Sequence, residues 1–244
     1  MSDLRGRRVV IVGGGSGIGE AVALALRDVG AVVTIVGRDA ARLETTRQRL
    51  GAKVRAEAGD VSDEASAARL FTAIGPFDDL VTTAATSSSL LGVSASMADM
   101  PMANAERFMA GKFWTQYRAA RAALPHLSAR GTITFTSGVA SRKIMPRHTV
   151  IAANNAALEA MAKQLAREVA PRRVNVVSPG LTSTATYDHL PPERREAFFA
   201  EVRRQLPTGE VASAADVAEA YLFVLRASAL TGAVVDIDGG FLVS

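Results

Sequence analysis

The chain has 244 residues, of which 48% are hydrophobic and 21% are charged, so it can bury a sizeable core and is not expected to be disordered. Its formal charge is +4, but the basic residues are spread along the chain and only 5% of residues are aromatic, which argues against a nucleic-acid partner. The absence of cysteine excludes disulfides, thiolate catalysis and cysteine-bound zinc.

Apolar, β-branched runs alternate with stretches of helical period from one end of the chain to the other. The first strand is predicted at residues 8–12, and the first helix at 17–29 has Ile18, Val22, Leu26 and Val29 along one stripe. Further strands are predicted at 31–36, 53–58, 79–83, 131–136, 173–177 and 233–237. Further helices are predicted at 39–50, 62–74, 102–127, 150–168, 193–205 and 213–226, with Asp39, Ser62 and Ser213 as N-caps of the first two and the last.

This alternation predicts an α/β protein with a doubly wound Rossmann fold. We expect a seven-stranded, mainly parallel sheet with helices on both faces, because strands that are apolar throughout need cover on both sides. Residues 1–244 are predicted to form a single dinucleotide-binding domain, since no linker, repeat or low-complexity segment interrupts the pattern.

The turn between the first strand and the first helix is rich in glycine, in the order Gly13-Gly14-Gly15-Ser16-Gly17-Ile18-Gly19. Glycines allow a tight turn and let backbone N–H groups approach a pyrophosphate, and the helix N-terminus supplies partial positive charge to it. The strand, loop and helix context is the one that this motif requires. Six residues are therefore predicted to bind a dinucleotide: Gly13, Gly15, Ser16, Gly17, Ile18 and Gly19.

Together with landmarks further along the chain, this loop resembles the short-chain dehydrogenase/reductase family over essentially the whole sequence. The segment 59–62 (GDVS) is similar to the one whose aspartate contacts adenine, and 178–184 (SPGLTST) resembles the Pro-Gly turn beside the nicotinamide. The segment 80–85 stands where the family has an Asn-Asn-Ala-Gly turn, of which only Ala84 matches. The resemblance implies cofactor contacts from Asp60, Val61, Ala84, Pro179, Gly180, Thr182 and Thr184.

The residue at the tip of the second strand indicates which nucleotide is bound. An NAD site usually has an acid there for the ribose 2′-hydroxyl, whereas this chain has Gly37 followed by Arg38. A guanidinium can pair with a 2′-phosphate, and glycine leaves room for it. NADP is therefore the predicted cofactor; the alternative is that Arg38 is only a solvated loop charge.

The catalytic positions depart from the family pattern, which has a serine, a tyrosine, a lysine and a supporting asparagine. Ser137 is the matching serine at the end of the fifth predicted strand, but the usual spacing places Val150 at the tyrosine and Asn154 at the lysine. No tyrosine lies between Tyr117 and Tyr187, so realignment does not restore the motif. Valine cannot transfer a proton and asparagine carries no charge, so ordinary carbonyl reduction needs another donor.

A second departure suggests that two residues have changed places. Counting back from the end of the 102–127 helix, the supporting asparagine of the family falls at Lys112. We expect Lys112 to bring its ammonium into the pocket from that helix, with Asn154 bonded to a ribose hydroxyl or to Lys112; the alternative is a surface lysine and a drifted site. His148, Tyr187 or Lys112 itself could donate the proton.

These observations predict an NADP(H)-dependent oxidoreductase that reduces a small carbonyl or imine-type substrate with a non-standard proton donor. The alternative is a non-catalytic protein that binds a nucleotide or a partner on the same fold. The family resemblance implies a homodimer or homotetramer, because long helices like those predicted at 102–127 and 150–168 form dimer interfaces in that family. We expect a cytoplasmic protein with no membrane partner and no metal, because no apolar run is long enough to span a bilayer and the three histidines lie far apart.

Overall fold

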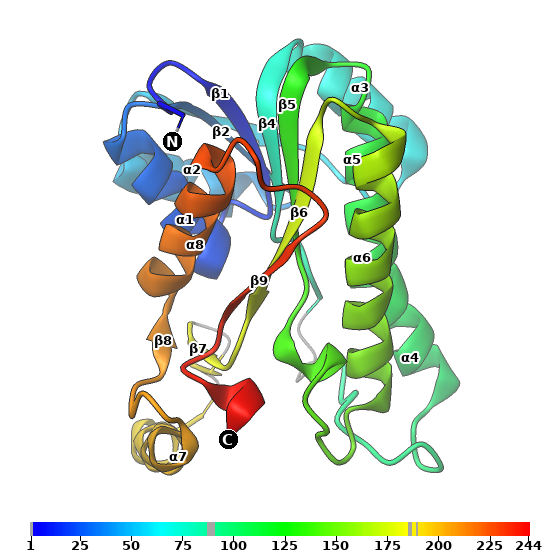
Figure 1. The fold of residues 1–244 in the computed structure, drawn as a ribbon, viewed down its shortest axis with the longest axis vertical. Coiled ribbons are helices and arrows are strands. Elements are labelled where there is room, and N and C mark those ends of the chain that lie inside the picture. Colours follow the sequence, from blue (N-terminus) through cyan, green and yellow to red (C-terminus); the bar gives the residue numbers. More distant parts are fainter. Residues whose placement is uncertain (1, 87–90, 185–186, 189) are drawn as a thin grey trace.

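The computed structural model of the chain describes residues 2–86, 91–184, 187–188 and 190–244. Within them, seven strands form one parallel sheet in the order β3-β2-β1-β4-β5-β6-β9 (Figure 1). The strands are β1 (Arg8–Val12), β2 (Val32–Gly37), β3 (Val54–Ala58), β4 (Phe77–Thr82), β5 (Leu127–Thr136), β6 (Arg173–Pro179) and β9 (Val234–Ile237). The predicted doubly wound Rossmann fold is confirmed.

Helices cover both faces of this sheet and divide the core into two layers. On one face lie α1 (Gly17–Asp28), α2 (Ala40–Leu50) and α8 (Ala214–Arg226), whose apolar residues pack in one cluster with β1 and β2. On the other face lie α3 (Glu64–Ile74), α5 (Thr115–Ala123) and α6 (Thr149–Glu168), packed on β4, β5 and β6. Figure 1 shows the two groups of helices on opposite sides of the sheet.

The strand order reverses between β1 and β4, where one half of the sheet winds away from the other. In open α/β sheets this is the place where a crevice opens at the carboxyl ends of the strands. The loops that follow β1, β4, β5 and β6 therefore meet there. Beyond those ends lie β7 (Thr182–Ser183), β8 (Ala212–Ser213) and α7 (Pro192–Gln205), at the bottom of Figure 1.

The predicted single helix over 102–127 is interrupted in the structure. It consists of α4 (Met102–Met109), a π-helical turn η1 (Ala110–Trp114) and α5, and β5 already begins at Leu127. In a π-helix each backbone bond spans five residues, which rotates the side chains relative to an ordinary helix. The Thr115 hydroxyl donates 2.9 Å to the Ala110 carbonyl, which satisfies an acceptor inside this turn. Lys112 lies at the centre of η1.

Two of the predicted helix caps are confirmed and one is wrong. The Asp39 side chain accepts a hydrogen bond from the Arg42 N–H, and Ser213 forms a capping box with Asp216. Helix α3 is capped by Asp63 and not by Ser62, since the Ser62 hydroxyl donates 2.7 Å to the neighbouring Asp60 carboxylate. A charged acceptor two residues away competes successfully for the serine hydroxyl.

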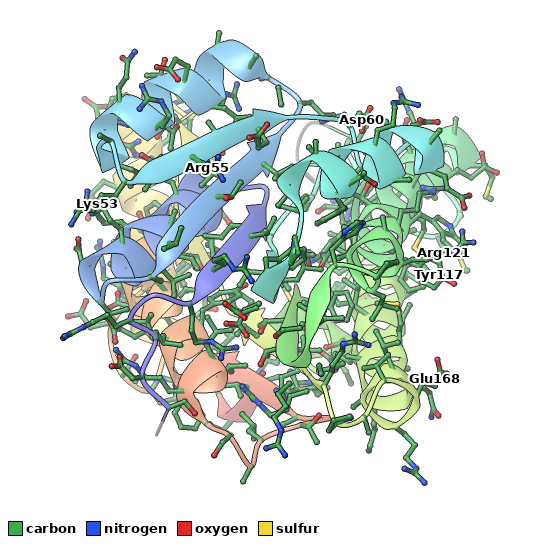
Figure 2. All side chains as sticks on the ribbon, turned by 90° about the horizontal axis from the view of Figure 1, so that it is seen from above. Lys53, Arg55, Asp60, Tyr117, Arg121 and Glu168 are labelled. Atoms are coloured by element: carbon green, nitrogen blue, oxygen red, sulfur yellow. The ribbon has the colours of Figure 1, made fainter. Side chains whose placement is uncertain are left out.

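One edge of the sheet is formed by β3 and lies across the molecule from α5 and α6. Seen from above, Lys53 and Arg55 lie at the β3 edge, while Tyr117, Arg121 and Glu168 lie on α5 and α6 at the opposite side (Figure 2). In the part of the chain that the structure describes, no helix combines the length and the apolarity that crossing a membrane requires.

Candidate functional site

The glycine-rich loop between β1 and α1 forms a turn that other residues could not make. Gly13 has φ +92°, and a Cβ there would lie 2.6 Å from the Ala84 backbone nitrogen. A Cβ on Gly19 would overlap the carbonyl oxygen of Gly13. The loop, the start of α1 and the end of β4 are thus packed backbone to backbone. This close packing is the cradle that a dinucleotide phosphate needs, so these residues fit the predicted cofactor.

The N-terminus of α1 has donors to offer to an anion. Its N-cap, Ser16, is extended and its side chain makes no capping hydrogen bond, so the first-turn N–H groups lack a side-chain partner. Thr184, which follows β7, lies beside this turn, 3.9 Å from where a Cβ of Gly17 would stand. The segment that follows β6 therefore reaches the start of α1 through Thr184.

The far end of the crevice carries positive charge next to Gly37. Arg38 is exposed, and it adds to the lowering of the Asp60 pKa, whose main cause is the hydrogen bond from Ser62. The stem of Arg42 passes 3.9 Å from where a Cβ of Gly15 would stand. Asp39, the nearest carboxylate in sequence, is engaged in capping α2. Arg38 thus directly follows the end of β2, and Arg42 lies in the first turn of α2 with its Nε 3.8 Å from the Asp39 carboxylate.

Lys112 brings a buried ammonium into the crevice from the π-helical turn. Its Nζ donates to the Ser137 carbonyl at 2.8 Å and to the Asn155 Oδ1 at 2.6 Å, and the residue is only 9% exposed. Burial lowers the Lys112 pKa to about 8, while the nearby Glu159 carboxylate acts in the opposite direction. An ammonium with this pKa can exist in either protonation state near neutrality.

The partner of Lys112 is Asn155, which corrects the expected bond to Asn154. Asn154 is fully buried, and its amide donates to the Phe108 carbonyl at 3.4 Å and to the Met109 sulfur at 3.2 Å. Its own Oδ1 has no hydrogen-bond partner among the described residues. Successive side chains on an α-helix point about 100° apart. The Asn154 side chain therefore faces α4, whereas that of its neighbour Asn155 faces Lys112.

The contact between Lys112 and Asn155 is also compatible with a comparison to the family that is shifted by one residue. If Asn155 stands in the lysine position, the residue four before it is Ile151, which has no hydroxyl either. The backbone of Gly138 adjoins Asn155, because a Cβ there would lie 3.0 Å from its Nδ2. Ser137, in contrast, donates its hydroxyl 2.9 Å to Glu159, one turn further along α6. The structure thus brings Lys112 and Ser137 together through a backbone oxygen, with the Ser137 hydroxyl turned to another partner.

The other candidate donors lie apart from Lys112. His148 is the N-cap of α6, and its Nδ1 lies 2.8 Å from the Pro146 carbonyl. It borders a pocket of about 560 Å³ with Ile144, Met145 and Phe241, and Lys112 is not among the residues that line this pocket. Tyr187 stacks against Phe198 with ring centroids 5.5 Å apart, and burial raises its pKa.

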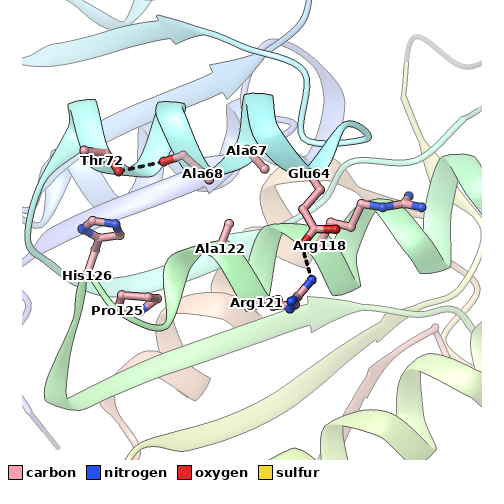
Figure 3. Close-up of a pocket in the computed structure, with 9 residues that line it drawn as sticks. All are labelled: Glu64, Ala67, Ala68, Thr72, Arg118, Arg121, Ala122, Pro125 and His126. Atoms are coloured by element: carbon pink, nitrogen blue, oxygen red, sulfur yellow. Dashed lines mark hydrogen bonds and ion pairs between the residues drawn. The ribbon is translucent and has the colours of Figure 1, made fainter.

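A second pocket, of about 330 Å³, lies on the outside of the molecule between α3 and α5 (Figure 3). Glu64 and Arg121 pair at one end of it, and His126 lies at the other end. Its lining contains none of the residues of the crevice. No group of acidic or histidine side chains suited to a metal ion occurs among the residues described in the structure.

Three residues of the site have no counterpart in the sequence-based expectations: Asn155, Glu159 and Arg42. The Asn154–Asn155 pair leaves two possible registers, and only the helix phase distinguishes them. Glu159 lies in a helix whose charges could all face water, and nothing in the sequence indicates that two serine hydroxyls meet it. Arg42 follows a cap residue, as many solvated helix charges do.

Comparisons with known proteins identify the family to which the fold belongs. A family profile described as "Enoyl-(Acyl carrier protein) reductase" matches residues 13–242. The chain is 34% identical to the short-chain dehydrogenase/reductase ATR9 of Stachybotrys chlorohalonatus, over 98% of each chain, and 31% identical to the D-erythrulose reductase of Gallus gallus, over 98% and 97%. It is also similar to a crystal structure of a small-chain dehydrogenase in complex with NADPH, with 34% identity and a TM-score of 0.79 over 98% of this chain and all of the other.

Proposed function

The chain belongs to the short-chain dehydrogenase/reductase family, and from that premise we propose that it is an NADP(H)-dependent oxidoreductase. Its proposed substrate is a small carbonyl or imine-type compound, and its proposed proton donor is Lys112. One observation carries this proposal: a buried ammonium group lies beside the glycine-rich crevice, held by Ser137 and Asn155.

The residues of the crevice would hold NADP in a defined order. The loop from Gly13 to Gly19 and the uncapped start of α1 would bind the pyrophosphate. Asp60 and Val61 would border the adenine, and the segment from Pro179 to Thr184, with Ala84, would border the nicotinamide half. When bound, NADPH supplies a hydride. Arg38 would pair with the 2′-phosphate, which favours NADP over NAD.

Lys112 can support the reaction in two ways. Two of its three N–H donors go to Ser137 and Asn155, which leaves one for the oxygen or nitrogen of a substrate. Its charge stabilises the negative charge that develops on a carbonyl oxygen during reduction, and burial strengthens this effect. With a pKa of about 8, the ammonium also gives up its proton readily to a newly formed alkoxide. A substrate that arrives as a protonated imine needs less of this help.

A calorimetric titration with NADPH and NADH, followed by an assay with ketones and imines, tests the proposal. We expect NADPH to bind more tightly than NADH, and turnover to fall about 100-fold in Lys112→Met. The matched control is Lys163→Met, which removes an exposed lysine from α6. Turnover by Lys112→Met that equals that of the starting protein would contradict the role of Lys112.

The choice of nucleotide has its own test. In Arg38→Ala we expect the affinity for NADPH to fall about tenfold, because one bidentate phosphate contact is lost. The affinity for NADH stays the same, since it has no 2′-phosphate. Equal losses for both nucleotides would show that Arg38 acts on the loop and not on the phosphate.

A second candidate function is a non-catalytic nucleotide-binding or partner-binding protein. It is favoured by the absence of a hydroxyl at both Val150 and Ile151 and by the engagement of Ser137 with Glu159. This function predicts tight NADPH binding with no turnover of any carbonyl or imine. The same titration and assay therefore distinguish the two candidates.

We also propose that the chain forms a homodimer or homotetramer through the α5 side. Trp114 and Tyr117 are 44% and 40% exposed there and pack edge to face with centroids 5.6 Å apart. Exposed aromatic groups of this kind favour protein contacts. Multi-angle light scattering of the starting protein and of Tyr117→Glu tests this, and a monomeric starting protein would contradict it.

A further inference from the structure

Ser137 is held from two sides by groups of opposite charge. Its carbonyl oxygen accepts a hydrogen bond from the Lys112 ammonium, while its hydroxyl donates to the Glu159 carboxylate. Glu159 lies on α6, one helical turn after Asn155, the second partner of Lys112. Ser137 is thus the one residue through which the Lys112 ammonium and the Glu159 carboxylate are linked.

Glu159 is arranged to act as a fixed negative charge. Its Oε1 accepts hydrogen bonds from the hydroxyls of Ser137 at 2.9 Å and Ser141 at 2.7 Å. Its side chain is only 13% exposed, so water screens this charge weakly. Two hydroxyl donors on one oxygen hold the carboxylate in place and leave it no freedom to turn toward solvent.

Glu159 shares its nearest arginine, Arg142, with a second carboxylate. Arg142 approaches it only to 3.4 Å, whereas the same guanidinium pairs with Asp236 through two nitrogens at 2.6 and 2.5 Å. Arg142 also donates to Ser178 at 2.9 Å. Arg142 is thus shared between the two carboxylates, with its shorter contacts on Asp236, and the Glu159 charge acts on both Arg142 and Lys112.

The other ionisable groups near the π-helical turn act weakly on Lys112. On α4 and α5, Glu106 and Arg107 are exposed and Arg118 lies over the Trp114 ring. At the start of α6, His148 lies against the Pro146 carbonyl. Among the described residues, Glu159 is the carboxylate whose charge raises the Lys112 pKa against the lowering by burial.

We propose that Glu159 is a positioning residue that keeps the Lys112 ammonium protonated and in place, by clamping Ser137 between the two charges. This proposal rests on the proposed role of Lys112 in the reaction. In this proposal Ser137 is the residue held between the two charges, and Glu159 supports the reaction through Lys112 without touching the substrate. Removal of the Glu159 charge leaves burial unopposed, so Lys112 loses its proton at a lower pH.

Direct titration of Lys112 by NMR tests this without any cofactor or turnover. The chain has only four lysines, so protein labelled with ¹³C at the lysine Cε gives few signals, and Lys112 is assigned by its absence in Lys112→Met. In Glu159→Gln, which can still accept both serine hydroxyls, we expect the Lys112 signal to titrate about one pH unit lower. Turnover at pH 7.5 then falls about threefold, because a smaller fraction of Lys112 is protonated.

Two further variants complete the experiment. Glu168→Gln removes an exposed carboxylate from the same helix and is expected to leave the Lys112 titration unchanged. Glu159→Asp keeps the charge, so its Lys112 signal is expected to titrate close to the pH of the starting protein. An unchanged Lys112 titration in Glu159→Gln would overturn the clamp. Failure to bind NADPH would overturn the proposed function and leave the titration readable.

Discussion

The two sides of the crevice are built by different means. On the nucleotide side, the turn from β1 to α1 depends on backbone atoms and on the absence of side chains at Gly13 and Gly19. On the other side, η1 and α6 depend on the side chains of Lys112, Asn155 and Glu159. The first side keeps the glycine pattern of the family, whereas the second has no tyrosine and no lysine at the family's Tyr-x3-Lys positions.

The difference follows from how each side is constrained. A phosphate cradle needs bare backbone, and any Cβ at its closest contacts must displace a neighbouring strand or loop. A charge, in contrast, can reach the same point in space from either of two adjacent helices, because a lysine side chain is long and flexible. The proposed exchange of Lys112 with Asn155 would keep a positive charge in the site and supply it from η1 in place of α6.

The largest effect is expected from filling the cradle. A Cβ in Gly19→Ala meets the Gly13 carbonyl, so the loop must move and NADPH affinity should fall by about 100-fold or more. Gly15→Ala is the comparison variant in the same loop, and it should lose less affinity, because its Cβ meets only flexible side chains, Leu43 at 3.3 Å and Arg42 at 3.9 Å. Calorimetry measures both. Equal NADPH affinities for the two variants would show that the close contact between Gly19 and the Gly13 carbonyl does not limit binding.

Restoring the family arrangement tests the exchange on the other side. Lys112→Asn removes the ammonium and Asn155→Lys adds a second one next to the first, so each single variant should lose about 100-fold in turnover. The double variant has one ammonium again, now from α6, and should return to within about tenfold of the starting protein. Steady-state kinetics of the three variants measure the coupling. A double variant as poor as the product of the singles would contradict the exchange.

The two asparagines should differ although they are neighbours. Asn155→Ala removes an acceptor of the ammonium, and loss of a hydrogen bond to a charge is worth about tenfold or more in turnover. Asn154→Ala removes an amide whose Oδ1 is unpaired, so turnover should stay within about threefold. The same kinetic assay compares them. A larger loss of turnover for Asn154→Ala than for Asn155→Ala would instead favour Asn154 at the lysine position, as the spacing from Ser137 predicts.

The smallest effect is a pH dependence of stability. The Lys112 pKa is about 8 in the folded protein and 10.5 at its ordinary value, so above pH 8 the unfolded state holds a proton that the folded state has lost. Stability therefore rises with pH, by roughly 1 kcal/mol between pH 7 and pH 9 from this group. Urea unfolding at both pH values measures it. The rise should be absent in Lys112→Met, and an equal rise in both proteins would contradict the burial of a charge.

The sequence predicts the sheet, the helices and the phosphate loop because these depend on periodicity and on glycine. It also identifies Lys112, since a count from the end of a helix reaches it. The bond from Lys112 to Asn155 could not be predicted, because a one-residue choice on α6 depends on helix phase. The π-helical turn that carries Lys112 has no composition of its own, and the contact between Ser137 and Glu159 depends on tertiary packing.

The π-helical turn has a practical consequence. The only tryptophan of the chain, Trp114, ends this turn two residues after Lys112, with its ring edge to face against Phe113 at 4.9 Å. Its fluorescence therefore comes from one position on the segment that carries the ammonium, with no second indole to obscure it. A chain without cysteine also accepts a single engineered thiol as an unambiguous labelling point. The protein therefore has one native fluorophore, Trp114, and an acceptor dye can be attached at any single position that is changed to cysteine.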